Sequence, residues 1–333
     1  MKVLLGLSGG VDSAVAALLL REQGHEVLGC YLDNGLPGVE AAKNCAEALH
    51  IPLTVTDIRA ELEQQVCAPF TAAYLRGETP NPCVLCNPTV KLPSLLREAD
   101  RQGAACIATG HYARTEGGAL YKGRVPNDQS YMLCRLQRSQ VERLLLPLGA
   151  YNKEQVREIA RRHGLAVADK AASMEICFIP DKNYARYIEQ RGITPPIGQF
   201  IYHGQTVGQH RGVHHYTLGQ RRHLGIALGQ RVYVSGIDSE KNTVTLSDDD
   251  EVWTDSIRLR EVSLLTDAVY PFRCTARIRH SRSDSPAAWV YGDGRVVFDS
   301  PVRAPTPGQA CALYDGERVV GGGWIQLEMS PHS

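Results

Sequence analysis

The chain has 333 residues, of which 43% are hydrophobic and 22% are charged, and its formal net charge at neutral pH is zero. These values predict an ordinary globular protein of two or three domains, and the neutral balance by itself neither indicates nor excludes a nucleic-acid partner. No apolar run is long enough to cross a bilayer, and the first residues have the pattern of a strand without the features of a secretion signal, so we expect no membrane span and a cytoplasmic location.

The chain opens with an apolar strand that leads directly into Ser8-Gly9-Gly10-Val11-Asp12-Ser13, followed by a helical run at 14–23. Adjacent glycines let a backbone turn its N–H groups inward, and the N-terminus of the next helix adds partial positive charge. This predicts a loop that holds phosphate. The spacing and the lysine of the common P-loop are absent, and the alternative is a turn that simply requires two glycines.

Strands and helices then alternate through the first half of the chain. Strands are predicted at 26–32, 53–57 and 105–109, and helices at 39–49, 61–75, 90–102 and 153–163. A short hairpin is expected around Gly117 and Gly118. This alternation predicts an α/β domain with a mostly parallel sheet, helices on both faces and ligands at the carboxyl ends of the strands.

The chain contains ten cysteines but shows no features of a secreted protein. The cysteines are therefore expected to have catalytic, metal-binding or packing roles rather than to form a disulfide framework. Segment 77–88 contains three prolines and is predicted to be a stiff loop that presents Cys83 and Cys86 on one side. Cys177 lies in a second loop at 169–179. A Cys-x-x-Cys pair alone also fits a zinc knuckle or a redox dithiol. The others stand among apolar or helical residues and are interpreted as packing: Cys30, Cys45, Cys67, Cys106, Cys134, Cys274 and Cys311.

From about residue 194 the pattern changes to short β-type runs spaced by glycines, including a predicted hairpin at 232–237 and 243–246. Segments 192–237 and 268–283 contain no acidic residue but several arginines and histidines. Such stretches can follow a polyanion backbone, or they can be solvated basic loops. We expect a catalytic domain at 1–190 and two small, mainly β domains at 191–252 and 253–333.

The loop Ser8–Ser13 resembles the pyrophosphate loop of the ATP pyrophosphatase (PP-loop) superfamily, whose catalytic domain has an adenine nucleotide α-hydrolase-like fold. Read together, several segments resemble the MnmA family of tRNA-specific 2-thiouridylases over nearly the whole chain. These segments are 8–13, 79–87, 108–112, 128–131, 175–179, 216–222, 306–309 and 321–323. The resemblance implies replacement of the C2 oxygen of wobble uridine 34 in tRNA by sulfur, after ATP has adenylated that oxygen.

The resemblance also implies binding residues, each at the position that matches the family's motif. ATP would contact Gly6, Leu7, Ser8, Gly9, Gly10, Val11, Asp12, Ser13, Leu32 and Gly110, with Mg²⁺ near Asp12. The target base and tRNA would contact Asn81, Pro82, Cys83, His111, Asn127, Asp128, Gln129, Arg279, His280 and Gln309. The alternatives for these residues taken alone are a histidine that caps a strand end, for His111, and a polar turn, for 127–129.

The sulfur chemistry is assigned to cysteines by the same resemblance. Cys177 would carry a persulfide received from a sulfur-relay protein, and Cys86 would release that sulfur and form a disulfide with Cys177. Many family members have aspartate where this chain has Cys83. The substitution creates a set of three cysteines resembling thiolases in which three thiolates hold a [4Fe–4S] cluster with one open iron. Both routes stay open at this point.

Two other functions fit parts of the sequence. A PP-loop synthetase that adenylates a small molecule would use the same opening loop, and an RNA-binding protein could retain a degenerate nucleotide site. The three cysteines and the acid-free segments would have no role in a small-molecule synthetase. The intact loop at 8–13 argues against an RNA-binding protein with a degenerate nucleotide site. The oligomeric state is not predicted.

Overall fold

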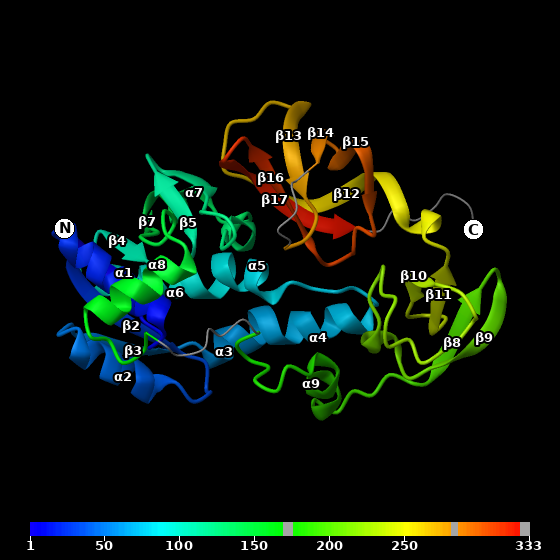
Figure 1. The fold of residues 1–333 in the computed structure, drawn as a ribbon, viewed down its shortest axis with the longest axis horizontal. Helices are drawn as coiled ribbons and strands as arrows, with labels where there is room; N and C mark the ends of the chain where they lie inside the picture. The colour runs from blue at the N-terminus through cyan, green and yellow to red at the C-terminus, as the bar shows by residue number, and fades with distance from the viewer. Residues whose placement is uncertain (169–175, 281–285, 327–333) are drawn as a thin grey trace.

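The computed structural model describes residues 1–168, 176–280 and 286–326. The chain begins with a parallel sheet of order β3-β2-β1-β4-β7 (Figure 1). Its strands are β1 Lys2–Gly6, β2 Glu26–Asp33, β3 Leu53–Asp57, β4 Cys106–Ala108 and β7 Leu144–Leu145. Every pairing in this sheet is parallel, which confirms the predicted α/β domain.

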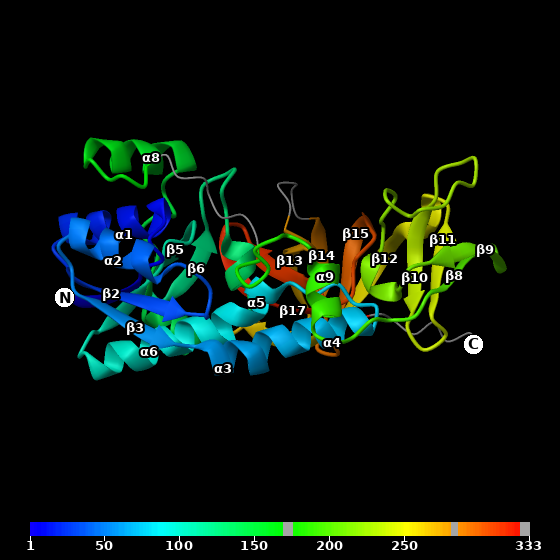
Figure 2. The same ribbon diagram turned by 90° about the horizontal axis from the view of Figure 1, so that it is seen from below.

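Helices cover both faces of the sheet because successive residues of β1 point to opposite sides. Val3 and Leu5 pack in one core with α1 Val11–Glu22, α2 Val39–Ala48 and α8 Lys153–Arg162. Leu4 packs in the other core against α6 Leu92–Arg101. Figure 2 shows α1, α2 and α8 on one side of β2 and β3, with α6 on the other.

Two long helical stretches each contain a π-helical turn. The first is α3 Arg59–Leu62, η1 Glu63–Cys67 and α4 Ala68–Leu75. The second is α5 Pro82–Cys86, η2 Asn87–Lys91 and α6. Both coincide with predicted helices, but the second begins earlier than expected.

The prediction that Cys83 and Cys86 lie on an irregular loop is wrong, because both lie in the first turns of α5. Oδ1 of Asn81 accepts hydrogen bonds from the backbone N–H groups of Cys83 and Val84 at 3.2 and 3.3 Å, and Pro82 occupies the first helical position. Asparagine at the N-cap followed by proline is a strong start signal for a helix. Pro88 has no N–H to donate, and the π-helical turn accommodates it.

The central part is a four-stranded sheet of order β10-β11-β8-β9 that follows helix α9 Tyr184–Gln190. Its strands are β8 Gly198–Tyr202, β9 Gln205–His210, β10 Tyr233–Asp238 and β11 Thr243–Ser247. The predicted hairpin is confirmed as the antiparallel pair β10–β11. Phe200, Val234 and Val244 are fully buried in a core of its own.

The last part is an antiparallel barrel of order β12-β15-β14-β13-β16-β17, which closes because β12 also pairs with β17. Its strands are β12 Trp253–Leu264, β13 Phe272–Arg277, β14 Ala287–Val290, β15 Arg295–Arg303, β16 Ala310–Asp315 and β17 Arg318–Gln326. The structure also contains four further short helices, namely η3 Ser130–Leu133, α7 Arg138–Glu142, η4 Val213–His215 and η5 Asp250–Val252.

A hairpin from the first half of the chain extends the barrel sheet. Strands β5 Ala113–Glu116 and β6 Ala119–Lys122 form the predicted hairpin, and β6 pairs with β17 through Tyr121 and Arg318. Nearby, Nη1 of Arg277 lies 2.9 Å from Oδ2 of Asp128, and both side chains are nearly buried, at 12% and 9% exposed. The barrel is therefore docked on the parallel-sheet domain by a shared sheet and a buried ion pair.

In the part of the chain that the structure describes, no helix is both long enough and apolar enough to cross a membrane.

Candidate functional site

The loop between β1 and α1 has the backbone of an anion-binding turn. Gly9 has a φ of +73°, and Gly10 is the N-cap of α1 without any side-chain cap. Oγ of Ser13 lies 3.2 Å from both the backbone N and Oγ of Ser8 and donates to the carbonyl of Gly10 at 3.0 Å. The N–H groups of the first turn of α1 therefore remain available to a phosphate ligand.

This loop lies where the strand order of the sheet reverses. β1 is flanked by β2 on one side and β4 on the other, and the chain leaves both β1 and β4 at the same sheet edge. Ligands of open α/β sheets bind in this crevice. Gly110 follows β4, and a Cβ there would lie 3.1 Å from the backbone of Asp12 and Ser13. A side chain at this position would require the two loops to shift apart by a few tenths of an ångström, so the glycine favours their close approach.

Asp12 is engaged by two side chains that the sequence did not single out. Both carboxylate oxygens lie 2.6 Å from Nζ of Lys153, at the start of α8, and Tyr112 donates its hydroxyl to Oδ1 at 2.6 Å. No motif in the sequence couples these residues, because they are 100 or more positions away from Asp12. The predicted ATP contact Leu32 is the second-to-last residue of β2, and it is partly buried between two cores.

The three cysteines of the predicted catalytic set differ in exposure: Cys83 and Cys177 are exposed, and Cys86 is half-buried. Cys86 and Phe178, the neighbour of Cys177, pack against the same cluster, which contains Val66 and Val90. The segment after residue 175 therefore adjoins the C-terminal end of α5. Within the described ranges, the three thiols do not form a group whose ligand atoms all lie within 4.8 Å.

Burial raises the pKa of the Cys86 thiol to about 11, opposed by Lys91 and reinforced by Cys177 and Cys83. The pKa of Cys83 is also raised, because neighbouring atoms partly desolvate its sulfur although the residue as a whole is exposed, and Lys91 again opposes this shift. At neutral pH both groups are predominantly thiols, so neither is a strong nucleophile before it is deprotonated. Lys91 is the positive charge that favours deprotonation of both.

Six of the seven cysteines predicted to have packing roles are buried, namely Cys30, Cys45, Cys67, Cys134, Cys274 and Cys311. Cys106 on β4 is half-buried. The predicted loop around Cys177 falls partly on residues 169–175, outside the described residues.

Thr79, close to the cysteines, is held by all three parts of the molecule. Its backbone N–H donates to the carbonyl of Pro307 at 2.8 Å, and Nε2 of Gln309 donates to its carbonyl at 2.6 Å. Its hydroxyl lies 2.9 Å from that of Thr217 in the central part. The segment leading to the N-cap Asn81 is therefore positioned by the barrel and the central part together.

Several residues predicted to touch tRNA use their side chains inside the protein. Asn127 accepts from the backbone N–H of Lys153 at 3.1 Å, and Gln129 accepts from that of Tyr112 at 3.0 Å. Asp128 accepts from Gly123, Ser130 and Arg277. These side chains, like Gln309, hold loops in place.

Of the remaining predicted tRNA residues, Pro82 is buried and the others are more accessible. Arg279 and His280 are exposed after β13, although Arg279 also donates to the carbonyls of Arg303 and Ala304. His111 is half-buried, with Nδ1 at 2.7 Å from the hydroxyl of Thr109. Burial, followed by Lys91, lowers the pKa of His111 to about 3, so its imidazole is neutral at physiological pH.

A basic pocket of about 620 Å³ lies between α9 and the central part. Arginines and histidines from the acid-free segment 192–237 gather in its wall, namely Arg211, Arg221, Arg222, His215 and His223, opposite Tyr184. Positive charge in a concave wall favours an anionic partner.

The chain matches three family models in order. Residues 1–181 match the model described as tRNA methyl transferase HUP domain, 187–248 the tRNA methyl transferase PRC-barrel domain, and 254–325 the Aminomethyltransferase beta-barrel domain.

Curated proteins named tRNA-specific 2-thiouridylase MnmA match the chain from end to end. The protein of Acetivibrio thermocellus is 42% identical over 358 residues, which cover 98% of this chain and 99% of that protein. The protein of Syntrophotalea carbinolica is 42% identical over 344 residues, which cover 97% and 98%. A solved 4-thiouridine synthetase–RNA complex with bound ATP is 18% identical, with a TM-score of 0.36 over 57% of this chain and 50% of that chain, and supports no conclusion.

Proposed function

The chain belongs to the MnmA family of tRNA-specific 2-thiouridylases, and on this premise we propose that it catalyses ATP-dependent 2-thiolation of wobble uridine 34 in tRNA. The observation that carries the proposal is identity of about 40% with proteins of this name along nearly the full length of both chains. The PP-loop, the cysteines and the two β-rich parts all lie within the matched length.

In the first step, the C2 oxygen of the uridine attacks the α-phosphate of ATP and pyrophosphate leaves. We assign the pyrophosphate to Ser8, Gly9, Gly10 and Ser13, whose backbone conformation and helix N-terminus suit an anion. The carboxylate of Asp12 suits Mg²⁺, an oxygen-seeking cation that would screen the phosphates. Lys153 forms an ion pair with the Asp12 carboxylate in this structure, so Lys153 and the cation would compete for that carboxylate.

In the second step, sulfur replaces AMP at C2, and the three cysteines allow two routes. In the persulfide route, the terminal sulfur on Cys177 attacks C2 and AMP leaves. The Cys86 thiolate then attacks Sγ of Cys177, which breaks the S–S bond to the new 2-thiouridine and leaves a Cys86–Cys177 disulfide. A relay protein supplies the persulfide, and a two-electron reductant restores both thiols.

In the cluster route, which we favour because Cys83 replaces a carboxylate, the three thiols would hold a [4Fe–4S] cluster. Their donor chemistry fits, since thiolates are the usual ligands of such clusters, and Cys83 and Cys177 are accessible from solvent. When bound, the cluster would hold sulfide at an open iron. Lys91 would favour the thiolate form of Cys83 and Cys86 in either route.

Wobble uridine must leave the anticodon stack before C2 can react, as in other enzymes that modify bases. We propose that Asn81 and Cys83, on either side of the buried Pro82, face the extruded base and that His111, Arg279 and His280 contact the anticodon stem-loop. Asn127, Asp128, Gln129 and Gln309 would act by holding the loops that shape this surface. We assign catalysis to 1–190 and tRNA binding to 191–252 and 253–333, in a cytoplasmic enzyme.

The function is tested by incubating the protein with tRNA, ATP, Mg²⁺ and a sulfur donor. We expect pyrophosphate release that requires tRNA, together with 2-thiouridine in the digested product. Pyrophosphate release without tRNA would instead identify a small-molecule synthetase, and tRNA binding without turnover would identify an RNA-binding protein. Both outcomes contradict the proposal.

Charge reversal in the basic pocket tests the tRNA-binding surface. We expect Arg221→Glu with Arg222→Glu to weaken tRNA binding at least about tenfold at 0.1 M salt and to lower the slope of log K against log salt by about 2, because two phosphate contacts are lost. ATP binding should not change. Arg161→Glu with Arg162→Glu on α8 makes the same charge change outside the pocket and serves as the control. Equal tRNA affinity of the pocket variant and the control would refute this assignment.

A further inference from the structure

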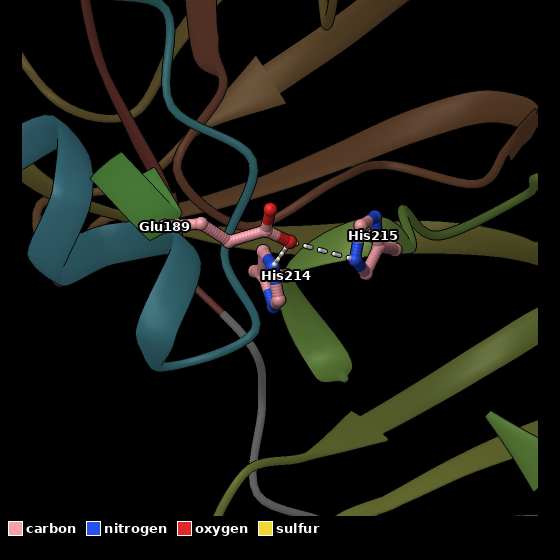
Figure 3. Close-up of side chains that lie close together, drawn as sticks. All are labelled: Glu189, His214 and His215. Atoms are coloured by element: carbon pink, nitrogen blue, oxygen red, sulfur yellow. Dashed lines mark hydrogen bonds and ion pairs between the residues drawn. The ribbon is translucent and has the colours of Figure 1, made fainter. Parts of the chain in front are cut away.

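A group of side chains outside the proposed thiolation site has the composition of a metal site. Glu189 lies on α9, and His214 and His215 lie on η4, which follows β9. One ligand atom from each residue can be chosen so that all three lie within 4.8 Å of one another. Figure 3 shows both imidazoles directed at the same carboxylate oxygen.

The spacing of these atoms is that of ligands around one small cation. Oε1 of Glu189 lies 3.2 Å from Nε2 of His214 and 3.3 Å from Nε2 of His215. A tetrahedral zinc ion with bonds of about 2.0–2.1 Å has neighbouring ligand atoms about 3.3–3.4 Å apart. The two observed distances therefore match two edges of such a tetrahedron without rearrangement of the chain.

The site is rigid on one side and open on the other. His214 is fully buried, and a Cβ at Gly212 would lie 2.8 Å from its Cε1, so the imidazole packs directly on that glycine. His215 is 14% exposed and Glu189 36%, and His215 also lines the basic pocket. An ion could enter from this pocket, where a solvent molecule or an anionic oxygen could complete its coordination.

The charges of the group also suit a cation. Among the described residues, the ion-pair partners of the Glu189 carboxylate are these two imidazoles alone. Neutral histidines with one carboxylate give the three ligands a net negative charge, and two histidines with one glutamate form a ligand set that zinc sites with an open position use.

We propose that Glu189, His214 and His215 bind one divalent cation of the zinc class at the wall of the basic pocket. The ion joins α9 to η4 of the central part, and α9 is the helix that follows the Cys177 segment. It would therefore fix that segment relative to the proposed tRNA-binding surface, in a role separate from sulfur chemistry.

The test uses Co²⁺, which reports tetrahedral nitrogen and oxygen ligands by visible absorption. The full-length protein carries Cys83→Ser, Cys86→Ser and Cys177→Ser so that these thiols do not compete, and it is freed of metal with a chelator. We expect one Co²⁺ per chain, with Glu189→Gln and His215→Asn each weakening binding at least about tenfold. His203→Asn, an exposed histidine in the same part of the molecule, should leave binding unchanged.

Absence of stoichiometric Co²⁺ binding, or equal binding by the Glu189→Gln variant, would overturn the proposal and leave two imidazoles that donate hydrogen bonds to one carboxylate. Glu189→Gln preserves the shape of the side chain, so it decides the question even if His215→Asn does not fold. Thermal melting of each variant verifies the fold. Since thiolation is measured separately on protein with intact cysteines, failure here has no bearing on the proposed function.

Discussion

Replacing Cys86 or Cys177 by serine is expected to lower 2-thiouridine formation at least about a thousandfold while tRNA-dependent pyrophosphate release continues. A serine hydroxyl can neither carry sulfane sulfur nor ligate iron as a thiolate does, and loss of a reacting nucleophile costs this much or more in other enzymes. The proposed adenylation site is the loop after β1, which neither variant alters. The measurement is single-turnover thiolation beside pyrophosphate release on the same samples.

Cys83→Ser separates the two sulfur routes. In the cluster route it removes both activity and about one cluster of iron and acid-labile sulfide per chain from anaerobically prepared protein. In the persulfide route it leaves activity largely intact, and metal-free protein works with a persulfide donor. Cys106→Ser, at a half-buried cysteine on β4, is the control and should behave as wild type. Retention of full thiolation by Cys86→Ser would contradict both routes.

The pH dependence of the thiolation rate also distinguishes the persulfide route from the cluster route. Because the pKa of Cys86 is raised to about 11, its thiolate fraction increases about tenfold per pH unit between pH 7 and 9. In the persulfide route, the release of sulfur by Cys86 therefore accelerates as pH rises and slows as pH falls. A rate that stays flat over this range would contradict attack by a free Cys86 thiolate.

Gly9→Ala is expected to reduce pyrophosphate release at least about a hundredfold. Gly9 has a φ of +73°, and a Cβ there would lie 2.5 to 2.7 Å from the backbone of Ala41 and Ala42. Backbone atoms cannot rotate aside, so the loop must move away from α2 and lose its anion-binding shape. ATP affinity and tRNA-dependent pyrophosphate release are the measurements.

Gly24→Ala is the matched control for this variant. Gly24 has a φ of +80°, but no atom lies within 4 Å of the position that its Cβ would take. Both variants incur a left-handed backbone penalty of about 1–2 kcal/mol, which thermal melting measures, and only Gly9→Ala adds the collision. Equal pyrophosphate release by the two variants would show that the loop tolerates a side chain at Gly9 and is not shaped as described.

Much of the candidate site could be read from the sequence because its signals are local. The strand, paired glycines and helix around Ser8–Ser13 are contiguous, and their periodicity and turn chemistry are set by neighbouring residues. The helix at Cys83 and Cys86 also had a local signal, the N-cap Asn81 followed by Pro82, but three prolines in one segment suggested a loop instead. The capping signal decides the local structure here, because proline is favoured at the first position of a helix.

The sequence by itself determined the α/β class, the change to β structure in the second half, and the residues whose chemistry suits phosphate and sulfur. Only the tertiary structure decided how distant segments meet. Four contacts join residues that are far apart in the chain. They are the ion pair of Asp12 with Lys153, the pairing of β6 with β17, the hydrogen bond from Gln309 to Thr79, and the cluster of Glu189 with two histidines. Such contacts depend on sheet order and domain docking, which are set by the summed burial of many side chains, so no single motif encodes them.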